Sequence, residues 1–295
     1  MDELVERFEE HRPRLRSVAY RMLGSTAEAD DAVQEAWLRL TRAEVGESKS
    51  EIENLGAWLT TVTARICLNL LRARTNRREE PLDVHVPDPI ISPRSGMDPE
   101  QEALLAEAVG LALSVVLETL TPAERLAFVL HDLFAVPFEQ IAPMIDRTPT
   151  AARQLASRAR RRVRDRAPAP DPDPKRQRDV VDAFFAAARD GDVDALVAVL
   201  DPHVVLRADG GGAATRPSAL IRGARSVAEQ ASFAAKLARF VRPALINGTP
   251  GAVVVTGGRV FSVMSFTVAG GRIATIEVLY DPDRLAGLDV AVLDA

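Results

Sequence analysis

Residues 121–166 read TPAERLAFVLHDLFAVPFEQIAPMIDRTPTAARQLASRARRRVRDR, which contains several helix starts and ends in a helix loaded with arginine. Thr121–Glu124 forms a capping box with proline at the first helical position, which predicts a helix start. A short second helix should open near Pro137, and Pro143 within it would bend that helix or mark an earlier end. Thr148–Pro149 repeats the cap signal. This order of elements is typical of a helix-turn-helix.

The last helix of this stretch has an apolar stripe and a basic opposite side. The stripe repeats at helical spacing, at Ala152, Leu155, Ala159 and Val163. The opposite side carries Arg153, Ser157, Arg160, Arg161 and Arg164. Arginines placed there can neutralise phosphates and form forked hydrogen bonds with guanine edges in the major groove. An arginine-rich face is also common as plain solvated surface, so the basic side alone does not establish DNA binding.

Length, charge and cysteine content narrow the class of protein. The 295 residues suffice for about two or three compact domains. The net charge is −5, so the basic helix differs in charge from the acidic chain as a whole. Any affinity for DNA has to come from such local basic patches. The lone Cys67 excludes an internal disulfide and a cysteine zinc site, and the histidines lack metal-ligand spacing. No signal segment or membrane-length apolar tract is evident, so we expect a cytoplasmic protein without cofactor or metal.

The first 78 residues are predicted to be helical throughout. Ser25–Glu28 forms a capping box, and the helix after it has one apolar side and one acidic side with Leu38 in its middle. An exposed leucine within a charged surround is typical of a protein-binding face. Asn54 can cap the next helix, whose polar side carries Thr61, Arg65 and Arg72.

Two proline-rich segments, residues 81–99 and Pro168–Pro174, are predicted linkers. The pattern after the second linker changes. Helices are expected over Asp179–Arg189, Asp192–Leu200 and Ser218–Leu237. Strands are expected over Val204–Ala208, Ala252–Thr256, Arg259–Val268 and Arg272–Tyr280, with Gly-Gly turns between the later ones. Helices followed by an antiparallel sheet indicate an α+β domain.

Several motifs resemble those of a known family. Residues 29–39, ADDAVQEAWLR, are similar to the helix by which bacterial sigma factors of the extracytoplasmic-function class dock on RNA polymerase. Residues 57–72 look like the helix that opens and reads the −10 element, with Asn69 where many relatives have aspartate. Residues 131–138 and 151–158 are similar to the subgroup with a C-terminal SnoaL-like domain of the nuclear-transport-factor-like cone fold.

The resemblance implies a multidomain fold: two all-α sigma domains, the second with the helix-turn-helix, and a C-terminal α+β cone. The implied domains are residues 1–80 (sigma region 2), 81–103 (linker), 104–167 (sigma region 4), 168–177 (linker) and 178–295 (SnoaL-like regulatory domain). The implied function is that of an RNA polymerase sigma factor and not of an enzyme. Its partners would be core polymerase, through the clamp of the largest subunit, and promoter DNA, with no membrane; an unidentified small ligand in the cone is left open.

Site residues follow from the same motifs. The implied polymerase-binding residues are Asp30, Asp31, Gln34, Glu35 and Leu38. The implied −10 contacts are Trp58, Thr61, Arg65, Asn69 and Arg72, and the implied −35 contacts are Thr150, Arg153, Gln154, Ser157, Arg158 and Arg161.

Two further motifs resemble regulatory elements of the subgroup. Residues 209–213, DGGGA, are similar to its DGGGK motif with alanine in place of lysine, and residues 85–89, HVPDP, are similar to its linker motif with histidine in place of tryptophan. The implied regulatory residues are Pro87, Asp88, Pro89, Asp209, Gly210, Gly211 and Gly212. We therefore expect the Asp209–Gly212 turn to pack near the first linker.

Two other classes of function are also compatible with the sequence. SnoaL-like cones also host cyclases and isomerases, and Asp209 and His203 flank the first strand of the domain, where either could act as a proton-transfer base. Fold alone does not imply such activity. A ligand-sensing regulator that acts without polymerase is the other class, and it would bind specific DNA as the isolated protein.

Overall fold

The computed structural model describes residues 2–45, 54–76, 84–93, 111–166, 168–211 and 217–288. The chain divides into two compact units, and the division falls within the helix α5 (Leu111–Glu118). The helical unit comprises residues 1–80 and 116–165, and the C-terminal unit comprises residues 81–115 and 166–295. The first linker of the sequence is therefore grouped with the C-terminal domain.

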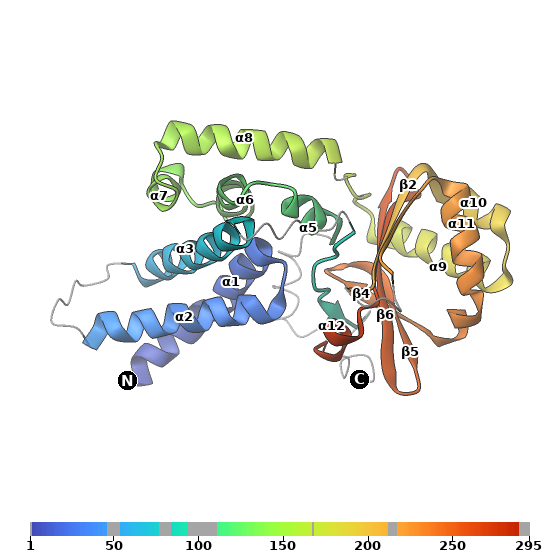
Figure 1. The fold of residues 1–295 in the computed structure, drawn as a ribbon, viewed down its shortest axis with the longest axis horizontal. Helices are drawn as coiled ribbons and strands as arrows, with labels where there is room; N and C mark the ends of the chain where they lie inside the picture. Colours follow the sequence, from blue (N-terminus) through green and yellow to red (C-terminus); the bar gives the residue numbers. More distant parts are fainter. Residues whose placement is uncertain are drawn as a thin grey trace. The chain divides into compact units, whose positions relative to one another are not determined.

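The first three helices of the helical unit are α1 (Asp2–Leu23), α2 (Thr26–Val45) and α3 (Leu55–Asn76) (Figure 1). Each buries one apolar side against the others, and the shared core contains Phe8, Leu15, Met22, Leu40, Leu59 and Leu68. Helix α2 begins one residue after Ser25, and Asn54 caps α3 by accepting the N–H of Ala57 at 2.9 Å. Both predicted helix starts are confirmed, and so is the helical character of the described residues of this segment.

The helix-turn-helix is also confirmed, with shorter middle elements than expected. Helix α6 (Pro122–Phe128) opens with the full capping box and continues into a π-helix, η1 (Val129–Leu133). The middle helix α7 (Phe138–Ile141) ends before a 3₁₀ turn, η2 (Ala142–Met144), and α8 (Pro149–Arg166) follows. Pro143 lies in that turn, because a proline inside the helix would lose a backbone hydrogen bond. The proline thus ends the helix and does not kink it.

Arginines join the first three helices to the helix-turn-helix within the helical unit. Arg125 of α6 is buried, and its Nε donates to the carbonyl of Arg21 at 3.0 Å. Burial lowers the pKa of Arg125 to about 10, so its charge is retained at neutral pH. In the other direction, Arg14 donates to the carbonyl of Phe134 at 3.1 Å and Arg65 donates to that of Pro143 at 3.3 Å.

The C-terminal unit is a mixed sheet covered on both faces. Its helices are α9 (Pro174–Asp190), α10 (Val193–Val199), α11 (Ala224–Phe233), the 3₁₀ helix η3 (Ala234–Phe240) and α12 (Pro282–Ala286). Its strands are β1 (Ile91–Ser92), β2 (Leu200–Asp209), β3 (Ala219–Arg222), β4 (Val241–Ile246), β5 (Thr249–Thr256), β6 (Arg259–Ala269) and β7 (Arg272–Leu279). The strand order is β1-β4-β5-β6-β7-β2-β3.

Successive residues of a strand point to opposite faces of the sheet, and each face has its own apolar cluster. Helices α9, α10 and α11 cover one face (Figure 1), where Phe184, Leu196, Val227 and Phe266 are buried together. The other face buries Val263 and Leu279 against Val86 of the first linker and Leu285 of α12. The period-two alternation of the strands separates the two clusters.

The structure corrects the predicted C-terminal pattern in several places. Residues 219–222 of the expected third helix are strand β3, and α11 begins only at Ala224. The sheet is not wholly antiparallel, because β2 pairs with β7 in parallel. Within the predicted linker, Ile91 and Ser92 form strand β1, which pairs with β4. Strand β3, the parallel pairing of β2 with β7, and strand β1 all depend on tertiary pairing. Neither a short strand nor the direction of a strand has a strong signal in the local sequence.

A carboxylate is buried in the sheet of the C-terminal unit. Glu277 of β7 is fully buried, with Arg207 Nη1 3.4 Å and the Thr275 hydroxyl 3.2 Å from its carboxylate oxygens. Burial raises the pKa of Glu277 from 4.5 to about 7, against the attraction of Arg207. The folded state therefore binds a proton more tightly than the unfolded chain does, and this stabilising contribution is lost as pH rises toward 7.

We expect Glu277→Gln to reveal how much Glu277 contributes to the pH dependence of stability, because glutamine keeps the hydrogen bonds and carries no charge. The free energy of unfolding of the variant relative to wild type should rise with pH between 4.5 and about 7, by up to about 1.4 kcal/mol per pH unit. Denaturant unfolding followed by far-UV circular dichroism at several pH values measures this difference. A difference that stays constant over this pH range would contradict the prediction.

Candidate functional site

The acidic face predicted for polymerase binding lies on α2. Asp31, Gln34 and Leu38 are exposed, and Glu35 is half-buried and forms an ion pair with Arg39 at 2.9 Å. Asp30 forms an ion pair with Arg16 of α1 at 2.6 Å. Leu38 is 40% exposed, which is unusual among the large apolar side chains of the described residues. The face thus has an apolar centre with charged and polar side chains around it, an arrangement that is common in protein interfaces.

The residues predicted to contact the −10 element share one side of α3. Arg65, Asn69 and Arg72 are exposed, and Trp58 and Thr61 are half-buried. Arg65 is held by the carbonyl of Pro143 at 3.3 Å, and the Thr61 hydroxyl donates to the carbonyl of Ala57 at 2.9 Å. The structure therefore brings the five side chains together as a polar surface with aromatic content.

The residues predicted to contact the −35 element lie on α8. Thr150, Gln154, Ser157 and Arg161 are exposed on its outer side, whereas Ala152, Ala156 and Ala159 are buried. Arg153 stacks over the ring of Phe138 with its guanidinium carbon 5.2 Å from the centroid, a cation–π contact. Arg158 lies 3.9 Å from the carboxylate of Glu124. Two of the predicted contacts therefore also have protein partners.

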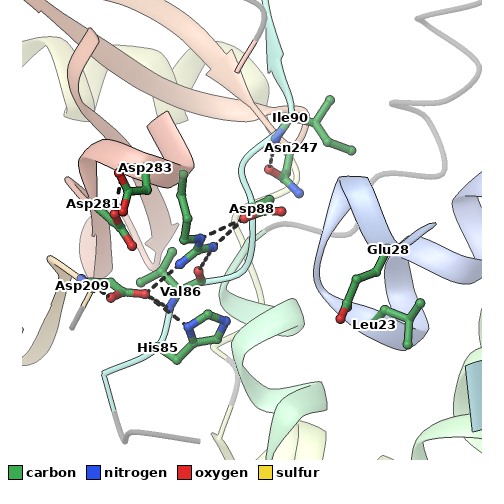
Figure 2. Close-up of polar contacts among 12 residues, drawn as sticks. Leu23, Glu28, His85, Val86, Asp88, Ile90, Asp209, Asn247, Asp281 and Asp283 are labelled. Carbon is green, nitrogen blue, oxygen red and sulfur yellow. Dashed lines mark hydrogen bonds and ion pairs between the residues drawn. The ribbon is translucent and has the colours of Figure 1, made fainter. Parts of the chain in front are cut away.

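A second cluster lies in the C-terminal unit, where residues of the first linker meet the end of β2. Asp209 is buried, and its carboxylate accepts the backbone N–H of Val86 at 2.9 Å and that of Gly211 at 3.0 Å. The ring of His85 lies 3.2 Å away (Figure 2). Burial would raise the pKa of Asp209, but the hydrogen bonds from His85, Val86 and Gly211 outweigh it and lower the pKa to about 2. Asp209 is therefore a fixed negative charge.

Arg284 of α12 connects this carboxylate to the linker. Its guanidinium donates to Asp209 at 2.9 Å, to the carbonyl of Val86 at 2.6 Å and to the carboxylate of Asp88 at 2.6 and 2.9 Å. These are charge-assisted bonds in a half-buried site, so they are stronger than neutral ones. We call His85, Val86, Asp88, Asp209 and Arg284 the linker clasp.

Backbone pairing and apolar contacts extend the linker clasp along the linker. Asn247 accepts the N–H of Ile90 at 2.9 Å through its side chain and donates its own N–H to the carbonyl of Ile90 at 2.8 Å (Figure 2). Val86 is fully buried in the apolar cluster of the sheet face. The described linker residues are therefore built into the C-terminal domain.

Of the predicted regulatory residues, Asp88 and Asp209 belong to the linker clasp, and Gly211 donates its backbone N–H to Asp209. Pro87 and Pro89 are buried beside Asp88, while Gly212 and Ala213 lie outside the described residues. Gly211 has φ +72°, and a Cβ there would collide with the carboxylate of Asp281, so this turn requires glycine.

Sequence reasoning missed Arg284, His85 and Asn247 as functional residues. Asp281-Pro282 is a helix-start signal after the last strand, and it could have indicated a helix that carries Arg284. No local signal shows that this arginine reaches residue 88, which is 196 positions away.

The residues considered for an enzymatic reaction are not brought together in the cone. Asp209 faces the linker, and His203 is exposed on β2, where its backbone N–H donates to the carboxylate of Asp201 at 2.7 Å. Between the sheet and α9–α11, the described residues include the buried apolar side chains of Phe184, Leu196 and Phe266. No helix among the described residues is long and apolar enough to cross a membrane.

Comparisons with known proteins match the two helical regions to family models and nearly the whole chain to individual relatives. The model of sigma-70 region 2 matches residues 7–77, and that of sigma-70 region 4 matches residues 110–163. The chain is 37% identical over 299 residues to the ECF RNA polymerase sigma factor SigJ of Mycobacterium tuberculosis, covering 96% of this chain and 93% of SigJ. It is 35% identical to the probable ECF sigma factor SigI of the same species, covering 93% of this chain and 92% of SigI.

A solved structure extends the similarity to the fold. The crystal structure of Mycobacterium tuberculosis SigJ matches with a TM-score of 0.77 and 35% identity, and the match covers 97% of this chain and 99% of that one. The C-terminal α+β domain is therefore the SnoaL-like extension that the sequence predicted.

Regions 2 and 4 together define a sigma-70-type transcription initiation factor. The chain belongs to the family of extracytoplasmic-function RNA polymerase sigma factors. It binds core RNA polymerase and directs transcription initiation at specific promoters, and its family is not enzymatic. The class and function predicted from the sequence are confirmed.

Proposed function

We propose that this sigma factor docks on the clamp of the largest polymerase subunit through the exposed face of α2. The charge and apolar centre of that face support the assignment: Asp31 and Gln34 surround Leu38, which is 40% exposed. The opposite side of the same helix is committed to the core through Ala32, Val33 and Ala36. Because transcription takes place in the bacterial cytoplasm, we also propose that location for the protein.

DNA contacts are assigned to α3 and α8. The polar side of α3 would hold the −10 element through Arg65, Asn69 and Arg72, and the outer side of α8 would read the −35 element. Gln154 and Ser157 are exposed there and can hydrogen-bond base edges, and Arg161 can form a forked pair with guanine. Two weak DNA sites on one chain reinforce each other through effective concentration.

We expect Arg153→Ala and Arg161→Ala to reduce promoter-dependent transcription by a factor equivalent to about 1–3 kcal/mol, because a forked guanine contact is worth that much. Arg164→Ala, near the end of α8, should have a smaller effect that is similar on all sequences, as a phosphate contact does. Transcription with core polymerase on matched and scrambled −35 templates measures both effects. Equal losses on both templates from all three variants would remove the base-reading assignment.

The C-terminal domain is proposed to modulate initiation by holding the first linker. The observation that carries this proposal is the set of contacts by which Arg284 joins Asp88 and Val86 to Asp209. The path of the linker decides how far the two promoter-reading regions can separate, so a domain that holds its start can control their spacing. This role is independent of small-molecule chemistry, and the catalytic alternative is not favoured because Asp209 is already engaged.

A further inference from the structure

The arginines of α8 fall into two groups by their position around the helix. Arg161 and Arg164 lie on the outer side, and like the flanking arginines they are exposed. Arg158 and Arg162, which are four residues apart, share one flank of the helix, and Arg160 lies on the other flank. The flanking group has acidic partners from the preceding elements of the helix-turn-helix.

Glu124 holds the first flank. Its side chain is 5% exposed, and its carboxylate accepts a hydrogen bond from Arg162 Nη1 at 2.8 Å and lies 3.9 Å from Arg158 Nε. The same carboxylate accepts the backbone N–H of Thr121 at 3.2 Å and its hydroxyl at 2.8 Å. Glu124 is therefore fixed in place by the cap of α6 while it holds arginines of α8.

Asp132 holds the other flank. Its side chain is 20% exposed, and its carboxylate lies 2.7 Å from Arg160 Nε. Asp132 belongs to the π-helix that follows α6, so both acidic residues come from the scaffold that supports α8. Because the acidic partner in each pair is largely buried, salt weakens these pairs less than it weakens fully exposed ones.

We propose that Glu124 and Asp132 are specificity-determining residues for DNA recognition, which hold the flanking arginines Arg158, Arg160 and Arg162 away from phosphates. Phosphate contacts raise affinity for every sequence and carry no base information. A helix with all its arginines free would bind the many non-specific sites more strongly, and the ratio of specific to non-specific binding would fall. When these flanking arginines are held by the two acidic residues, DNA contacts are made by the outer side of α8. The inference rests on the proposed role of α8 as the −35 reader.

The test uses the full chain and a fluorescent duplex of scrambled sequence, with binding followed by anisotropy at several NaCl concentrations. Glu124→Gln and Asp132→Asn are the variants, and glutamine still permits the capping box at position 124. Glu139→Gln is the matched control, because Glu139 is exposed on α7 and the variant loses the same charge. We expect the two variants to bind scrambled DNA several-fold more tightly than this control, with a salt slope steeper by about 1 for each arginine released.

A gain in binding separates this role from a structural one, because a damaged fold would bind DNA less well. Adding Arg162→Ala to Glu124→Gln should reverse the part of the gain that comes from Arg162, since Glu124 and Arg162 form a direct pair. Salt slopes of Glu124→Gln and Asp132→Asn equal to that of Glu139→Gln would overturn the inference. If Arg164→Ala, which removes the phosphate contact proposed for the outer side of α8, weakens binding to scrambled DNA in that case, only the inference falls; if it has no effect, the proposed DNA-binding role of α8 falls as well.

Discussion

Reversal of two charges on α2, Asp31→Lys together with Glu35→Lys, is expected to abolish co-purification of the chain with core RNA polymerase. Asp31 is exposed and Glu35 is half-buried, and the new lysines would face the partner surface that the acidic side chains complement. Like charges placed in an interface cost several kcal/mol and slow association. The fold should survive, because only the ion pair between Glu35 and Arg39 is lost, and such a pair is worth about 0.3–0.5 kcal/mol.

The control for this pair lies on α1. Glu6→Lys with Glu10→Lys reverses two exposed charges at the same helical spacing and changes the net charge equally. Affinity capture with tagged core polymerase should recover the control variant at the wild-type level and the α2 variant at background level. Recovery of both variants at the wild-type level would move the polymerase interface away from α2. Leu38→Ala gives a second measure, because it removes the apolar centre without a change of charge.

Loss of the linker clasp is expected to have the second large effect. Arg284→Ala removes the bonds to Asp88, Asp209 and the carbonyl of Val86, and it leaves the buried Asp209 without its arginine partner. Loss of one partner of a hydrogen-bonded buried charge costs about 1–3 kcal/mol or more. Amide exchange over residues 84–92 should therefore accelerate about tenfold or more. Transcription with core polymerase should change several-fold.

Three comparisons make this prediction specific. Asp209→Ala and truncation before Arg178 should shift transcription in the same direction as Arg284→Ala, because each releases the linker. Arg259→Ala serves as the charge control, since Arg259 is exposed at the start of β6. The modulating role is refuted if the clasp variants speed amide exchange yet initiate at the wild-type rate. Faster exchange in the Arg259→Ala variant would show that the effect is not local to the clasp.

The sequence by itself determined the elements whose signals are local. Thr121–Glu124 and Asn54 start helices because their side chains accept backbone N–H groups a few residues away. The acidic and basic faces of α2 and α8 follow from helical periodicity alone. The resemblance of several motifs to those of known sigma factors indicated the family, and membership of that family indicated the function. The ends of α7 were less certain, because the sequence left open how Pro143 would be accommodated.

Only the tertiary structure decided what depends on distant partners. The first linker carries no strong strand signal, yet β1 forms there because the edge of β4 offers hydrogen bonds to it. Asp209 could have been a base in the cone, and it is instead held by Val86 and Arg284. Likewise, the ion pairs of Arg160 with Asp132 and of Arg162 with Glu124 form only in the folded helix-turn-helix. Such pairings join residues tens to hundreds of positions apart, and local propensity contains no information about them.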